Sequence, residues 1–300
     1  MRKERIGLVL LLIILTSQVF LSEQMYLIYT QKGEELTVKE LAKSLQSCDV
    51  VFIGEFHGNS ANHRFQQDIL PFLSEEGKAG IAISMEMFER DVQETLNAYL
   101  GGKITRNQFI EKARPWPNYP KDYEPLIEFA KKHSIPVIAA NVPRRIASHL
   151  VKTGNLSSIG ESERKYHAKK HNVWDDEYKK RFYQTISSIK HPEESKQPEQ
   201  ENDFLYRMYQ AQCLKDDTMA ESMHSYLLEN PGILIVHFNG DFHSNSWLGT
   251  ADRLRKLDEN LNICVVSPVL TESPDDIEFI PEYSGAGDFI LFVTENNKDS

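Results

Sequence analysis

Two nearly identical heptapeptides hold the side chains best suited to chemistry: GEFHGNS begins at Gly54 and GDFHSNS begins at Gly240. Each places an acidic residue two positions before a histidine. These side chains are Glu55, His57, Asp241 and His243. Residues two apart in an extended backbone point the same way, so each heptapeptide is expected to present a carboxylate and an imidazole together. The Asn-Ser that ends each one is expected to cap a helix, which would begin near Ala61 or Trp247.

A third carboxylate, Glu86, closes the apolar run IAISM and joins this set. Imidazole and carboxylate together suit Zn, Mn, Fe or Co, and the residue types do not choose among these metals. The predicted metal ligands are His57, His243, Glu55, Asp241 and Glu86. In a hydrolase, Glu55 or Glu86 would be the general base beside the metal. The alternative is that both heptapeptides are structural turns whose acids and histidines satisfy backbone groups.

The elements that must position these residues are predicted to be alternating strands and helices. Six short, β-branched apolar runs are predicted strands: residues 50–54, 81–88, 135–141, 233–240, 262–270 and 289–295. Segments with helical periodicity lie between most of them, including 61–76, 91–100 and 122–133. This alternation predicts an α/β fold with a mainly parallel sheet covered on both faces. Ligands of such sheets bind beyond the carboxyl ends of the strands, where the acids and histidines fall.

Residues 143–230 interrupt this rhythm with a helical insertion, expected to form a lid over the site. Its best helices are residues 165–184 and 202–229. The charged, proline-containing residues 190–203 between them are predicted to be a mobile loop.

A histidine pair lies in the first of these helices. His167 and His171 are four apart, so on a helix they would share one face and could bind a metal or ligate haem. Lys169 and Lys170 between them favour a solvated face instead.

Aromatic residues gather in a proline-stiffened loop before residue 124. Trp116, Tyr119 and Tyr123 could form a flat apolar wall for a planar ligand, or a small aromatic cluster under the loop. Arg144 or Arg145 could bind carboxylates of that ligand in a bidentate manner. Arg144 is favoured because it lies just past a strand end.

Composition excludes some functions. Lys plus Arg against Asp plus Glu gives 34 − 44 = −10, which argues against a nucleic-acid partner. GxGxxG, GxxxxGK[ST] and GxSxG motifs do not occur, which argues against dinucleotide, P-loop and serine-hydrolase sites. The three cysteines form no CxxC pair and are interpreted as small buried apolar residues. A disulfide between two of them stays open.

The N-terminal residues 1–24 have a basic start and an apolar run that is short against the roughly 20 residues of a membrane span. They are predicted to be an export signal or an uncleaved anchor, and the only membrane association expected is through them. The protein is expected to be exported to the periplasm or cell envelope, with residues 25–300 as one domain. No cysteine follows the apolar run, so lipid attachment is not expected.

Six ordered blocks carry a family resemblance: VVFIGEFHGNSANH, ISMEMF, RPWPNYPKDYEPLIEFA, IPVIAANVPRR, YQAQCLKDDTMAESM and FNGDFH. From about residue 30 to 270 the chain resembles the ChaN family of iron-regulated, haem-binding uptake proteins. That family is grouped with Tiki and TraB proteins and erythromycin esterase-like enzymes, some regarded as metal-dependent peptidases or hydrolases. Two G-x-x-H turns and an added glutamate mark the group. They match Gly54 to His57, Gly240 to His243, and Glu86, and the arginine of the NVPR block is Arg144.

The resemblance implies a three-layer α/β core, export, a role in haem or iron acquisition, and a homodimer that shares haem. The axial ligand stays open, because Tyr and His both ligate haem iron. The residues expected at the haem site are Tyr119, Tyr123, Arg144, Tyr166, His167 and His171. The rival prediction is a hydrolase or peptidase that uses a divalent metal at the two G-x-x-H turns.

Overall fold

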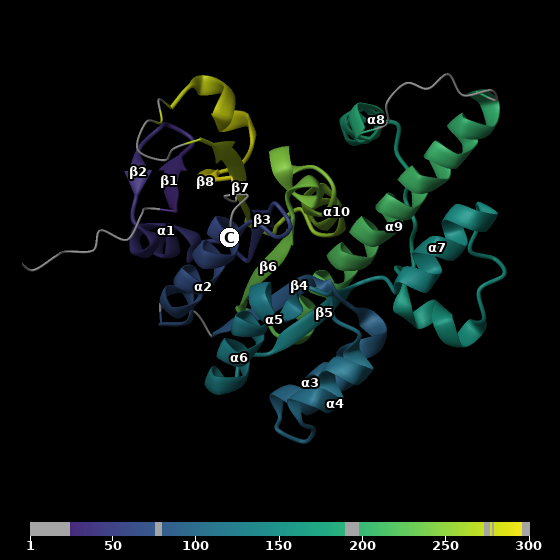
Figure 1. The fold of residues 1–300 in the computed structure, drawn as a ribbon, viewed down its shortest axis with the longest axis horizontal. Helices are drawn as coiled ribbons and strands as arrows, with labels where there is room; N and C mark the ends of the chain where they lie inside the picture. The colour runs from purple at the N-terminus through teal and green to yellow at the C-terminus, as the bar shows by residue number, and fades with distance from the viewer. Residues whose placement is uncertain (1–24, 76–79, 190–197, 273–276, 278, 296–300) are drawn as a thin grey trace, which may run out of the picture.

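The computed structural model describes residues 25–75, 80–189, 198–272, 277 and 279–295 (Figure 1). The predicted export segment, residues 1–24, lies outside them. None of the described helices combines the length and the apolar character that crossing a membrane requires.

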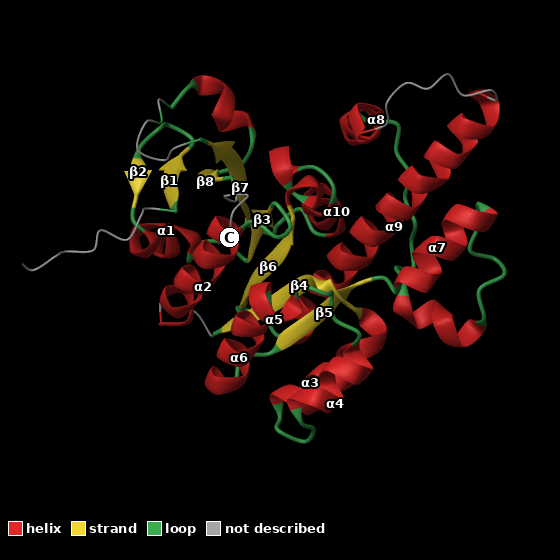
Figure 2. Cartoon of the chain, in the orientation of Figure 1, coloured by secondary structure: helices red, strands yellow, loops and turns green. Residues whose placement is uncertain are grey.

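One eight-stranded sheet organises the molecule (Figure 2). Its order is β2-β1-β8-β7-β3-β6-β4-β5. The strands are β1 (Tyr26–Thr30), β2 (Glu35–Leu36), β3 (Val50–Glu55), β4 (Ile81–Glu89), β5 (Val137–Asn141), β6 (Leu234–Gly240), β7 (Ile263–Thr271) and β8 (Phe289–Thr294). All six predicted strands are confirmed, and they pair in parallel. The sequence did not reveal β1 and β2, which add an antiparallel edge.

Helices cover both faces of the sheet, which confirms the α/β class (Figure 1). One face packs against α1 (Val38–Leu45), α2 (Ser60–Glu75), α3 (Gln93–Leu100), α4 (Arg106–Ala113) and α6 (Glu124–His133). The other packs against α10 (Thr250–Leu257) and the second half of α9 (Pro198–Glu229).

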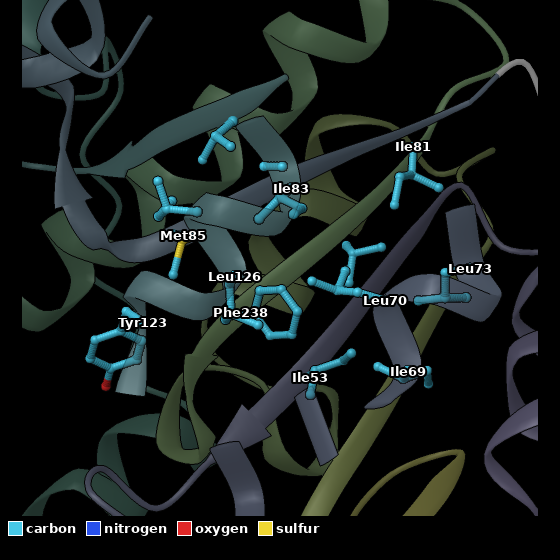
Figure 3. Close-up of a cluster of buried hydrophobic side chains, with 14 of the residues drawn as sticks. Ile53, Ile69, Leu70, Leu73, Ile81, Ile83, Met85, Tyr123, Leu126 and Phe238 are labelled. Carbon is cyan, nitrogen blue, oxygen red and sulfur yellow. The ribbon is translucent and has the colours of Figure 1, made fainter. Parts of the chain in front are cut away.

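The strands divide their apolar side chains between these two layers with a period of two. Ile53 packs with Ile69 of α2 on the first face (Figure 3), whereas its neighbour Phe52 belongs to the cluster of α9 and α10 on the second. Because both faces are buried, β3 reads as a continuous apolar run rather than an alternating one.

The helical insertion differs from the prediction in two places. It contains α7 (Arg144–Thr153), a short 3₁₀ helix (η2, Glu161–Tyr166), α8 (Glu177–Ile189) and α9. Because α9 begins at Pro198, the end of the predicted loop is helical, while residues 190–197 lie outside the described part of the chain. The second half of α9 packs against the sheet and is part of the α/β core. Only the rest of the insertion is an addition to that core.

The predicted helix over residues 165–184 is wrong in its first half, since residues 167–176 are not helical. Side chains of α9 take the backbone donors that a helix would use. Ala168 donates to Thr218, Lys169 to Glu221 and Asn172 to Asp217. His167 and His171 therefore do not share a helical face.

The structure decides the disulfide that the sequence left open, and burial is confirmed for Cys48 and Cys213, both 0% exposed. Cys48 and Cys264 form a disulfide with a Cα–Cα distance of 6.1 Å, which joins the chain just before β3 to the neighbouring strand β7. Cys213 is buried and free.

Candidate functional site

Parallel pairing brings the two heptapeptides side by side at the carboxyl edge of the sheet. Strand register places Gly54 opposite Asn239 and Glu55 opposite Gly240. Both glycines are required by close approach rather than by backbone angle. A Cβ on Gly240 would lie 2.7 Å from His57 Nε2, and one on Gly54 would lie 2.7 Å from Asp241 Oδ1. Each heptapeptide thus packs its side chains against the other one's glycine.

Glu55 and His57 form the predicted pair, with Glu55 Oε1 2.8 Å from His57 Nδ1. The Tyr123 hydroxyl donates to the same oxygen at 2.6 Å, and Gln66 Nε2 donates to the other at 2.6 Å. The carboxylate is buried, whereas the His57 side chain is 45% exposed and contacts Trp116 edge to face. Glu55 therefore holds an accessible imidazole in a fixed orientation.

The charges around His57 favour its protonated form. Burial alone would lower its pKa, but the hydrogen bond to Glu55 and the negative charges of Glu86 and Glu55 raise the pKa above its ordinary value.

His243 is buried between two carboxylates, and neither is Asp241. Its Nδ1 lies 2.6 Å from Asp216 Oδ1 and its Nε2 lies 3.3 Å from Glu86 Oε1. Burial opposes protonation, but the charges of Glu86 and Asp216 raise the pKa of His243 to about 10. In return, despite their burial, the His243 charge lowers the pKa of both carboxyls.

Asp241 faces the other way, so the predicted pairing of Asp241 with His243 is wrong. Residues 241–243 form a 3₁₀ helix (η3, Asp241–His243), in which positions two apart point in different directions. Asp241 instead accepts hydrogen bonds from Ser267 at 2.5 Å and Asn245 at 2.9 Å. Burial raises its pKa to about 6, against the opposing effect of the Ser267 hydrogen bond.

Of the two predicted helix caps, only the first is present. Asn59 Oδ1 accepts from the backbone of Asn62 at 2.9 Å, which confirms the predicted start of α2. After the second heptapeptide the next α-helix begins at Thr250 rather than near Trp247, because Ser246 and Trp247 have left-handed backbone angles that a right-handed helix does not admit.

The predicted metal site is not supported by this geometry. Within the described residues, no group of three or more His, Cys, Asp or Glu is arranged to hold a metal ion. The two turns instead form separate hydrogen-bonded centres, one around Glu55 and one around His243. Glu86 binds His243 through one oxygen and accepts from the Gly240 backbone at 2.7 Å through the other.

Asp216 is a functional candidate that the sequence did not reveal. It is fully buried on α9 and also accepts from Thr250 at 2.8 Å and from Tyr178 at 2.8 Å. It lies in a polar run within a helix, and sequence spacing alone gives no signal that it meets His243, 27 residues further along the chain.

A cavity of about 630 Å³ opens next to these centres, at the carboxyl ends of β4 and β5 and between α7, α8 and α9. Its walls are mainly apolar and aromatic, with charged groups among them. The lining residues used below are Glu86, Glu89, Trp116, Arg144, Ser148, Lys152, Phe182, Ile186, Met208, Ala211, Gln212 and Lys215. Arg144 and Glu86 thus lie at one cavity, as their positions at strand ends suggest.

The other side chains predicted to bind haem lie elsewhere. Tyr119 and Tyr123 are buried in the core, 1% and 0% exposed. Tyr166 packs beside α7, while His167 and His171 hydrogen-bond to the carbonyls of Ala168 and Gln210. None of these five is among the described residues that line the cavity.

Comparisons with known proteins agree with this architecture. A solved structure of ChaN from Campylobacter jejuni, described as showing cofacial heme binding, superimposes with a TM-score of 0.67 at 17% identity, covering 90% of this chain and 97% of that one. A mutant of the erythromycin esterase EreC in its open conformation gives 0.53 at 11% identity, covering 91% and 98%. Both likenesses concern the fold.

Among curated proteins, RETICULATA-RELATED 5, chloroplastic, of Arabidopsis thaliana is 26% identical over 91 residues, which are 30% of this chain and only 12% of that relative. The family model described as haem-binding uptake, Tiki superfamily, ChaN matches residues 41–254. This match spans more than half of the chain, including strands β3 to β6 and both heptapeptides, and the chain belongs to that family.

Proposed function

We propose that this protein binds haem in the cavity between α7, α8 and α9 and serves haem or iron acquisition. The observation that carries the proposal is the cavity itself, whose apolar walls stand beside basic side chains at the carboxyl edge of the sheet. Its volume lies within the range of small-molecule sites. Membership of the haem-binding uptake family supports the same ligand.

The wall chemistry suits a planar, largely apolar molecule. Trp116 reaches the cavity from the loop after α4, Phe182 from α8 and Met208 from α9. Burial of the flat apolar faces of haem against such side chains contributes about 25 cal/mol per Å². The predicted Tyr and His ligands do not line the cavity, so the proposal rests on the apolar walls and the basic groups.

The proposal includes export and a haem-sharing dimer. The Cys48–Cys264 disulfide supports export, because disulfides persist mainly in oxidising compartments outside the cytosol. The dimer is tested by light scattering before and after haemin addition, where a doubling of mass is expected.

The first test is a haemin titration of residues 25–300 followed by visible absorption. A saturable Soret shift at a stoichiometric ratio is expected, and folded protein that gives no shift would refute the proposal. Ser148→Trp fills the cavity from α7 and is expected to weaken binding at least about tenfold. His149→Trp, at the next position of the same helix and outside the cavity lining, is the matched control and should bind normally.

Hydrolysis is a second candidate, favoured by the accessible His57 held by Glu55. His57 Nε2 would accept a proton from water as the water oxygen bonds to an ester or amide carbonyl carbon. The same proton would pass to the departing alcohol or amine as the bond from carbon to that group breaks. Since this role needs the neutral imidazole, the rate should rise with pH through the raised pKa of His57.

Substitution separates the two candidates. His57→Asn should abolish hydrolysis of responsive esters in a substrate screen while leaving haemin affinity unchanged. His149→Asn, which changes a histidine on the surface of α7, is the control. Hydrolysis that persists in His57→Asn protein would exclude His57 as the base.

A further inference from the structure

We infer that the cavity recognises its ligand through acidic groups carried on an apolar body, with Lys215 as the inner anchor. The ligand class is then the dicarboxylic tetrapyrroles, with or without a central iron. This inference rests on the proposed haem-binding function and deepens it.

The first observation is that the cavity gathers three cations, of which Lys215 acts on Glu86 only at longer range, where its charge helps to lower the pKa of that carboxyl. Arg144, Lys152 and Lys215 line it, and none makes an ion pair with another residue of the described parts of the chain. Arg145, which follows Arg144 but does not line the cavity, is held by Asp91 at 2.5 Å and Glu163 at 2.6 Å. The surface near α7 therefore pairs the neighbouring arginine and leaves the cavity cations available.

The two carboxylates of the cavity, in contrast, already have close partners. Glu86 faces the protonated His243 and accepts from the Gly240 backbone. Glu89 binds Arg114 at 3.0 Å and accepts from the backbone N–H of Arg144 at 3.0 Å. The cavity lining therefore carries three cations against two carboxylates, in a chain whose overall charge is −10.

The cations stand on two different walls. Lys215 belongs to α9, one helical turn beyond Ala211 and Gln212, and it is half-buried. Arg144 and Lys152 lie on α7, about 12 Å apart along the helix axis at 1.5 Å per residue, and both are exposed. This arrangement offers separate contacts to two acidic groups of one ligand.

Burial makes Lys215 the strongest of these contacts. A charge-assisted hydrogen bond gains strength where water is partly excluded, while exposed ion pairs contribute little. Phe182, Ile186 and Met208 supply the apolar surface for the ring faces, and such contacts do not depend on the atom at the ring centre. Acidic groups and ring faces together thus define the ligand.

The experiment compares haemin, metal-free protoporphyrin IX and its dimethyl ester on residues 25–300, followed by quenching of tryptophan fluorescence. We expect haemin and the free acid to bind with Kd values within about fivefold of each other, and the ester at least about tenfold more weakly. Lys215→Gln should weaken the free acid about tenfold or more and leave the ester unchanged within about twofold. Arg144→Gln, at an exposed position, should have a smaller effect in the same direction.

Arg145→Gln is the matched control and should leave all three ligands unchanged, because its partners are Asp91 and Glu163. Haemin that binds more than about 30-fold tighter than the metal-free acid would show that the iron is recognised and would overturn this inference alone. Equal binding of the ester and the acid would overturn it as well. If none of the three binds to folded protein, the proposed haem function fails too.

Discussion

Replacing Asp216 with Asn tests whether the buried charges around His243 hold α9 against the sheet. Asp216 accepts from His243, Thr250 and Tyr178, so it joins α9 to η3, α10 and α8. Asn keeps the shape but removes the charge that balances the imidazolium. The amide NH₂ of Asn can only donate a hydrogen bond, whereas both carboxylate oxygens of Asp216 accept hydrogen bonds in the wild type.

The magnitude follows from the pKa of His243. Its rise from 6.5 to about 10 corresponds to ~5 kcal/mol at about 1.4 kcal/mol per pKa unit. Asp216 is the nearer of the two carboxylates, at 2.6 Å against 3.3 Å for Glu86. Because the charges of Glu86 and Asp216 both raise this pKa, we assign about half of the effect to Asp216, and expect Asp216→Asn to lower the free energy of unfolding by ~2–3 kcal/mol at pH 6.

The pH dependence has a definite sign. Because the folded-state pKa of His243 is raised, its stabilising effect is fully present below pH 6.5 and is lost as the pH rises toward about 10. Urea unfolding of the oxidised wild type should therefore show falling stability from pH 6.5 to 10. In Asp216→Asn this fall should be smaller and should occur at lower pH.

Asp252→Asn is the control for removing a carboxylate, since Asp252 forms a surface i,i+4 pair with Lys256. It should change stability by less than about 0.5 kcal/mol. The reasoning is refuted if Asp216→Asn unfolds within about 0.5 kcal/mol of wild type and keeps the same pH dependence.

Three more outcomes are expected. Cys48→Ala, which breaks the disulfide, should lower stability by about 2–5 kcal/mol, and a reducing agent should then no longer shift the melting temperature, as it does for wild type. Gly240→Ala would press a methyl against His57 and should cost at least about 1 kcal/mol in thermal unfolding, whereas Gly285→Ala, with open space around it, should be tolerated. Glu55→Gln should lower the pKa of His57 in an NMR titration, and an unchanged pKa would mean that their hydrogen bond does not raise it.

The sequence by itself determined the positions of the central strands and the α/β class of the fold. Residues 50–54 and 233–240 are nearly continuous apolar runs because parallel strands are covered on both faces, and this local property needs no tertiary information. The placement of Glu55 beside His57 was also local, since the two residues are only two positions apart in the chain. The edge strands β1 and β2 are short and partly exposed, so the pattern was too weak to show them.

Partners from distant segments were decided only by the tertiary structure. His243 was expected beside Asp241, but in the 3₁₀ helix their side chains point in different directions. The imidazole instead contacts Asp216, which belongs to α9. In the same way, side chains of α9 captured the backbone around His171 and prevented the predicted helix. Sequence periodicity reports which face of an element is apolar, whereas these contacts depend on which elements meet. That is set by packing across the whole chain, and so the cavity and its cations became visible only in the folded molecule.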